Sequence, residues 1–266
     1  MLTPVMLFVA GVLTPVGSVR SAQSVDTITL TVGHPSVDGT TYKEHWARAS
    51  RSIMKDGKVI KSVTYRSHTY VTKRAGVPVV VVASEPYPDG PDQAFREETV
   101  LDLHTTALVH VEQHDGTGRL LIADVAGTHV TGRLRASRSE PEEAFDFTLE
   151  TPAFFTPFVD AAIGATPIRD GQVWRVPTFS LGPKGRKVVW RTYHIVGHEP
   201  VPALSEVNDA WIVQDDAPGP TKIWITYEAP YLPQVLQYLP DGSVTRFASS
   251  LVKAPEDRAS VAAARR

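Results

Sequence analysis

The sequence of 266 residues contains no cysteine. Disulfide bonds, thiolate metal ligands, a cysteine nucleophile and an N-terminal lipid attached through cysteine are therefore excluded. A chain without such cross-links must be held together by its hydrophobic core. The length and a hydrophobic content of 42% permit a substantial core, and they argue against an intrinsically disordered chain.

A strong charge of one sign is also lacking. The formal net charge is −2, and Lys and Arg form no long block. The local basic cluster of Arg133, Arg135 and Arg138 is followed at once by three glutamates within residues 140–143. Because binding to phosphates needs a concentrated basic field, the sequence predicts that nucleic acid is not a partner.

The common catalytic motifs are missing as well. Gly-x-Ser-x-Gly, the P-loop, the dinucleotide glycine fingerprint and His-Glu-x-x-His do not occur. Adjacent acidic pairs such as Glu97-Glu98 and Asp215-Asp216 would point to opposite faces of a strand, so they are poor pairs for general acid–base work. The sequence predicts no cofactor and favours a non-enzymatic protein.

One apolar run stands at the N-terminus. Val5 to Val19 has the length of a secretory signal core, is short for a membrane span and is interrupted by Pro15. The small residues of Ala22-Gln23-Ser24 allow cleavage before Val25. We therefore expect residues 1–24 to be a signal peptide, the protein to be exported to the periplasm or secreted, and the mature chain to have no transmembrane anchor.

No Lys or Arg precedes this apolar run, so the positively charged start of a signal peptide is absent. An alternative stays open, in which the segment forms a first strand or helix of the folded domain.

Alternation of apolar and polar residues with period two predicts strands along most of the remaining chain. Turn signals such as Asp56-Gly57 and Asp241-Gly242 separate them. We expect a mostly β protein, an antiparallel curved sheet or open half-barrel of about ten strands, in a single domain over residues 25–250, with a frayed tail over residues 251–266. The expected strands are Val25–Val32, Val59–Thr72, Val77–Val82, Thr99–Gln113, Arg119–Val125, His129–Leu134, Phe145–Leu149, Gly171–Phe179, Lys187–Gly197, Asp209–Asp215, Thr221–Glu228 and Tyr231–Leu239.

One helix is predicted, over Pro152–Ala165, because its apolar residues form a single stripe at helical spacing. Thr151 is a suitable N-cap and Pro152 suits the first helical position. Pro157 conflicts with this start, so the regular helix has a second possible beginning there, with Thr156 as its cap.

Four segments of the second half resemble a known family. They are Phe147–Phe155, Ile168–Pro177, Asp209–Val213 and Lys222–Thr226, in that order. Together they are similar to exported bacterial β proteins catalogued only as a domain of unknown function. The positions that match the family pattern are Gly171, Trp211, Trp224 and Leu236.

The resemblance covers roughly residues 100–247, and short Trp-containing strands are of moderate specificity. It departs from the family at Thr226-Tyr227, where an Asp or Lys usually follows Trp-Ile. It implies a fold similar to the curved half-barrels of lipoprotein carriers and related lipid-binding envelope proteins. It transfers no catalytic residue.

Two groups of residues are candidate sites. Histidines at even spacing on two predicted strands are a candidate metal site, because imidazole is a common zinc ligand; these are His110, His114, His194 and His198. Aromatic residues of the second half are a candidate pocket for an apolar ligand; these are Phe154, Phe155, Phe158, Trp174, Trp211 and Trp224. The histidines could equally form a solvated face, and the aromatics could simply fill the core.

The sequence thus favours a non-enzymatic, exported envelope protein that binds a lipid-like apolar molecule, or an envelope protein, through its curved sheet. Two alternatives remain open. One is a metal-dependent hydrolase that uses the histidine strands, and the other is a scaffold that acts through a sheet edge.

Overall fold

The computed structural model describes residues 27–87, 95–182, 186–203, 206–217 and 219–255. The predicted signal peptide and residues 256–266 of the predicted tail lie outside these ranges.

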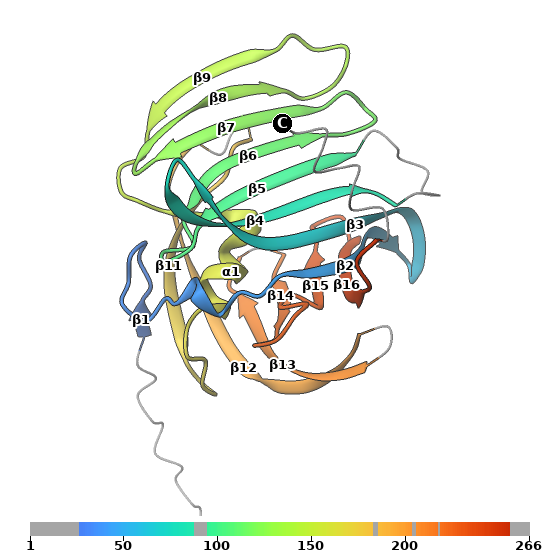
Figure 1. The fold of residues 1–266 in the computed structure, drawn as a ribbon. Coiled ribbons are helices and arrows are strands. Elements are labelled where there is room, and N and C mark those ends of the chain that lie inside the picture. The colour runs from blue at the N-terminus through green and yellow to red at the C-terminus, as the bar shows by residue number, and fades with distance from the viewer. Residues whose placement is uncertain (1–26, 88–94, 183–185, 204–205, 218, 256–266) are drawn as a thin grey trace, which may run out of the picture.

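The described chain forms one curved sheet around a short helix (Figure 1). The first nine strands are β1 Thr27–Thr29, β2 His45–Lys55, β3 Lys58–Arg74, β4 Val77–Pro86, β5 Arg96–Asp102, β6 Leu108–His114, β7 Leu120–Ala126, β8 His129–Arg135 and β9 Glu143–Thr148. The later strands are β10 Phe154–Phe155, β11 Val173–Phe179, β12 Val189–Ala203, β13 Glu206–Asp215, β14 Thr221–Ile225, β15 Gln234–Tyr238 and β16 Val244–Val252. The helical elements are η1 Gly39–Thr41, η2 Thr156–Phe158 and α1 Val159–Gly164.

The strand order is β1-β11-β12-β13-β14-β15-β16-β2-β3-β4-β5-β6-β7-β8-β9, and β10 pairs beside β1 on the same strand, β11. The pairings of β1 and β10 with β11 are parallel, and the others are antiparallel. The sheet does not close on itself. The expectation of a mostly β, open sheet is therefore confirmed, whereas a purely antiparallel sheet of about ten strands is wrong, because the sheet is mixed and has 16 strands.

Two causes explain most of the low strand number. First, β2 is rich in Ser, Arg and Lys, and β16 carries Arg246, Ser249 and Ser250, so both show little of the apolar alternation that marks a strand. Second, the predicted strand Thr99–Gln113 is a hairpin. Its turn is held by the carboxylate of Asp102, which accepts hydrogen bonds from the backbone N–H groups of His104 and Thr105 at 3.0 and 2.8 Å.

The predicted helix Pro152–Ala165 is much shorter than expected. Phe154 and Phe155 pair with β11, and regular α-helix extends only over the six residues of α1. Thr156 does not cap it, because its hydroxyl donates instead to the backbone carbonyl of Phe179 at 2.8 Å. Pro157 lies in the 3-10 turn η2, where its missing N–H costs nothing.

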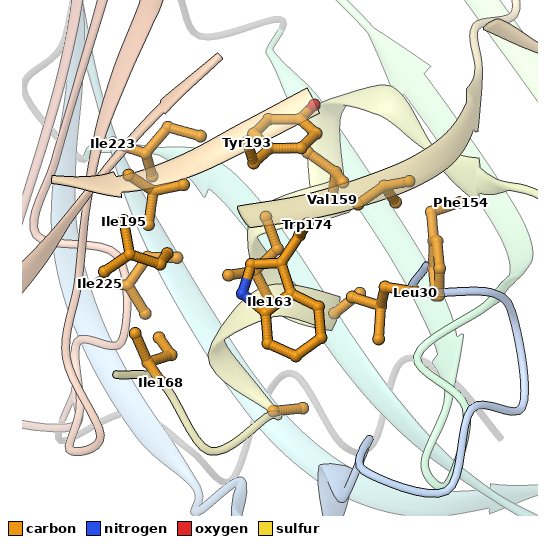
Figure 2. Packing of buried hydrophobic residues seen from close by; sticks show 14 of the residues in the cluster. Leu30, Phe154, Val159, Ile163, Ile168, Trp174, Tyr193, Ile195, Ile223 and Ile225 are labelled. Carbon is orange, nitrogen blue, oxygen red and sulfur yellow. The ribbon is translucent and has the colours of Figure 1, made fainter. Parts of the chain in front are cut away.

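The short helix lies between two halves of the curved sheet and joins two core clusters (Figure 1). On one side α1 packs with Ile163 among residues of β11 to β14, including Trp174 and Ile225 (Figure 2). On the other side, Ala161 packs among residues of β5 to β9, including Phe145. The helix therefore connects the inner faces of strands that are far apart in the sheet.

Candidate functional site

An internal cavity of about 600 Å³ lies between the inner face of the sheet and the segment that leads into α1. Its volume falls within the range of small-molecule binding sites. The lining comes from strands at both ends of the sheet order, from Leu121 on β7 to Tyr193 on β12. The site is therefore created by the curvature of the whole sheet.

Small side chains on the inner face of β2, β3 and β4 explain why this space exists. Ala47 and Ala49 on β2, Ser67 and Thr69 on β3, and Ser84 on β4 all line the cavity. Side chains at alternate positions of a strand share one face, and these five are too short to reach α1. Large side chains fill the corresponding space on the β11 to β14 side, where Trp174 is 2% exposed.

One part of the cavity wall is apolar. The two aromatic rings of Phe155 and Phe158 enter it from β10 and η2. Aliphatic and aromatic side chains of the sheet complete this surface: Val80, Val82, Leu101, Leu121, Ile223, Val235 and Phe247. A surface of this kind favours contact with a hydrocarbon chain or ring system over contact with water.

Charged side chains gather at one end of the cavity, which we call the mouth. Arg51 lies near the end of β2 and Arg119 directly before β7, and both are exposed. Glu97 on β5 accepts a hydrogen bond from the side-chain amide of Gln113 at 3.0 Å. Strand pairing places the turns β2–β3, β6–β7, β13–β14 and β15–β16 at this end.

An ion pair with a buried carboxylate also contributes to the wall near the mouth. Arg191 Nη1 lies 3.1 Å from Asp215 Oδ2, and the side chain of Asp215 is only 2% exposed. The other carboxylate oxygen of Asp215 accepts a hydrogen bond from the backbone N–H of Thr221 at 2.7 Å. Both charges are thus compensated, so this pair is suited to shaping the wall.

A carboxyl group with a different environment projects from α1. Asp160 lines the cavity, and burial raises the pKa of its carboxyl to about 7. It lies near the half-buried Tyr42 and the buried Tyr193, and burial raises the pKa of both phenols. The Tyr42 hydroxyl donates to the carbonyl of Ala161 at 3.1 Å. The cavity therefore has a polar group in its interior as well as charges at its mouth.

The six aromatic residues predicted to form a pocket do not lie together. Phe155 and Phe158 line the cavity. Phe154 points the opposite way from its neighbour into the packed core that contains Trp174 (Figure 2). The side chains of Phe154 and Trp174 are at most 2% exposed, because α1 packs directly against them.

The two remaining tryptophans lie elsewhere in the sheet. Trp211 packs against the edge of the same core and contacts the His198 ring, with the ring centroids 5.3 Å apart. Trp224 lies on the opposite face of β14, where its indole N–H donates to Glu199 at 2.7 Å. Neither of them lines the cavity.

The histidine strands do not meet. On β6, His110 and His114 point to the face opposite to that of Gln113, which lines the cavity. In the order of the sheet, nine strand pairings separate β6 from β12, which carries the other two histidines. His110 pairs with Asp124 at 2.8 Å, and His114 with Glu112 at 2.7 Å. In the part of the chain that the structure describes, no three potential metal ligands of the His, Cys, Asp or Glu type form a group.

His194 and His198 do not share a face either. A β-bulge between Ile195 and Gly197 shifts the register of β12 by one residue. His194 therefore points away from the core that contains Ile195, whereas His198 pairs opposite Trp211 on the core side. A single extra residue reverses the direction of every following side chain.

The sequence reasoning missed most of the cavity. It singled out aromatic residues, but the space depends on small residues such as Ala47, Ala49 and Ser67. The sequence does contain a signal for the cavity. The small residues alternate along β2 and β3, at positions where a filled core would carry larger side chains.

Fold and site together define an open, curved β-sheet protein with an internal cavity of mixed polarity. Among the described residues, no helix has the length and hydrophobicity needed to cross a bilayer.

Two of the solved structures that are similar to this chain are domains of unknown function. One is a β-barrel-like protein of the domain of unknown function DUF1849 from Brucella abortus; it is 13% identical, with 82% of this chain and 98% of that chain covered and a TM-score of 0.39. The other is a DUF1329 family protein from Desulfovibrio piger, 10% identical, with 80% and 85% covered and a TM-score of 0.28. Both are domains of unknown function, the kind of family that the sequence resembles.

No family model matches the chain, and no curated protein matches it. Evidence for the function must therefore come from the cavity.

Proposed function

We propose that this protein is a non-enzymatic, exported binding protein that holds an amphipathic, lipid-like small molecule in its cavity. The observation that carries the proposal is the 600 Å³ space left by the short side chains of β2 to β4 opposite Phe155 and Phe158. An empty space of this size inside a core has a cost in stability, because each lost contact forgoes dispersion energy. Its retention is explained if a ligand occupies it.

The distribution of polarity supports an amphipathic ligand. An apolar chain or ring system would contact the aromatic and aliphatic wall. A polar group would face the mouth, where Arg51 and Arg119 are exposed to solvent. The apolar segment at residues 5–19 supports a location outside the cytoplasm, where carriers of such molecules are needed.

A cavity-filling substitution tests this proposal. Ser67→Phe places a ring in the space between β3 and α1, whereas Thr72→Phe places the same ring on the opposite, exposed face of the same strand. We expect the wild type to bind an apolar fluorescent probe such as 1-N-phenylnaphthylamine saturably. Ser67→Phe should weaken that binding by about tenfold or more, and Thr72→Phe should leave it unchanged.

Circular dichroism and a thermal melt would first show that both variants are folded. The proposal fails if the wild type shows no saturable binding, or if both variants lose it to the same extent.

A further inference from the structure

The turn between β2 and β3 forms an exposed tip beside the mouth. All eight residues from Lys55 to Ser62 are exposed. Two of them are large and apolar: Val59 is 59% exposed and Ile60 is 62% exposed, the highest values among the large hydrophobic residues described. We call residues 55–62 the β2–β3 tip.

The tip is an ordered hairpin that extends past its neighbours in the sheet. β2 and β3 remain paired as far as Lys55 and Lys58. On the β2 side, β16 accompanies the hairpin only to Met54. On the β3 side, the described pairing with β4 begins at Tyr65, seven residues after the start of β3. The tip therefore projects from the end of the sheet that carries the charged cavity-lining residues Arg51 and Arg119.

The place of the two apolar side chains in the hairpin indicates what kind of surface the tip contacts. Met54 pairs with Val59 and Ile53 with Lys61, so Ile60 is an extra, bulged residue at the end of the hairpin. Both apolar residues lie before Tyr65, where the described pairing with β4 begins, so β4 covers neither of them. A lipid interface surrounds an inserted hairpin and therefore contacts both side chains.

The charge of the tip agrees with a lipid surface of negative charge. Lys55, Lys58 and Lys61 flank the apolar pair, and Asp56 is the one acidic residue within the tip. Lysines near an anionic bilayer attract it, while the apolar residues between them enter the headgroup region. Lys58 and Lys61 also oppose the addition of a further strand along this part of β3, which disfavours a β-strand of another protein as the partner.

We propose that the β2–β3 tip inserts into the surface of an anionic lipid bilayer and thereby brings the mouth of the cavity to the membrane. The inference goes beyond ligand binding, because it depends on the exposed hairpin and not on the occupant of the cavity. A carrier with this element would exchange its ligand at a bilayer surface, without a span through the membrane.

Vesicle sedimentation tests the proposal. The purified protein is mixed with vesicles of phosphatidylcholine alone, and with vesicles in which part of this lipid is replaced by phosphatidylglycerol. We expect the wild type to sediment with the vesicles that contain phosphatidylglycerol and to be released from them by salt.

Val59→Ser with Ile60→Ser should lower the partition coefficient of the protein onto these vesicles by about tenfold or more, since the two apolar side chains that enter the bilayer are then absent. Lys58→Glu with Lys61→Glu should remove the preference for phosphatidylglycerol.

A matched control removes two other exposed valines. Val77 and Val196 are 49% and 54% exposed and lie outside the tip, so Val77→Ser with Val196→Ser should leave vesicle binding unchanged. Equal loss in this control, or no vesicle binding by the wild type, would overturn the proposal. The proposal would also be overturned if analytical ultracentrifugation showed that the wild type is a dimer and that the Val59→Ser, Ile60→Ser variant is a monomer. The cavity probe should bind this variant as it binds the wild type, which separates the two proposals.

Discussion

Asp160 is a residue of α1 whose carboxyl group lines the cavity. It forms no ion pair with any residue that the structure describes, whereas the other interior carboxylate, Asp215, is paired with Arg191. Burial raises the pKa of Asp160 to about 7, so the folded protein keeps a proton that the unfolded chain releases near its ordinary value of 3.8. Between these two values the free energy of unfolding falls as the pH rises, and above about 7 the loss is complete.

Asp160→Asn should therefore remove a pH-dependent loss of stability. The measured quantity is the free energy of unfolding of the variant minus that of the wild type. We expect this difference to grow by about 1–2 kcal/mol between about pH 5 and pH 8. This is less than the full linkage value, because the carboxyl borders a cavity that water can enter. Urea denaturation at both pH values measures the difference. Tyr42 and Tyr193 stay protonated throughout, since burial raises the pKa of both.

His45 also lines the cavity, and burial lowers its pKa. Both proteins contain this histidine, so its titration cancels in the comparison. Equal stability differences at the two pH values would contradict the assigned environment of Asp160.

Among the elements, β7 and β8 approach each other with no room for a side chain at Gly132. A Cβ atom there would overlap the backbone carbonyl of Ile122 and lie 2.7 Å from the ring of Phe145. Neither neighbour can move cheaply, because one is backbone and the other is packed in the core that fills this half of the sheet.

Gly132→Ala should lower the free energy of unfolding by about 1–3 kcal/mol, the usual cost of overpacking. Gly182→Ala is the matched control, since a Cβ atom at Gly182 meets nothing within 4 Å. Chemical denaturation of both variants gives the comparison. A Gly132→Ala protein as stable as the control would show that β7 and β8 are not packed as described.

The elements also show what the sequence could and could not predict. Strands with clear alternation, such as β3 and β7, were found close to their observed bounds. β2 was missed although it lies between β16 and β3, because one of its faces borders a cavity and needs no large apolar side chains. The helix was overestimated, because pairing with β11 outweighed helical periodicity at Phe154 and Phe155.

The same limit applies to the candidate sites. The bulge at Gly197 separates the faces of His194 and His198, and such a one-residue shift leaves no mark in local periodicity. The choice of aromatic residues found two members of the cavity wall, Phe155 and Phe158. The polar members, such as Arg191 on β12 and Asp160 on α1, could not be found, because only the curvature of the sheet brings these elements together around one space.

For the whole molecule, the central feature is a sheet that curves around α1 but leaves a space beside it. The described strands form one continuous hydrogen-bonded order, and its two ends approach each other where Arg186 contacts Glu143 on β9 at 2.8 Å. The cavity lies within this curve, with its charged mouth on the side of the β2–β3 tip. Fold, cavity and tip are thus consistent with a carrier that meets its ligand at a lipid surface.

Native mass spectrometry of the protein recovered from a bacterial periplasm tests the central claim most directly. The account predicts an adduct with the mass of a lipid or similar amphipathic molecule on the wild type, retained in Thr72→Phe and lost in Ser67→Phe, because only the latter ring occupies the cavity. A wild type that is always bare, or an adduct that persists equally in Ser67→Phe, would contradict it.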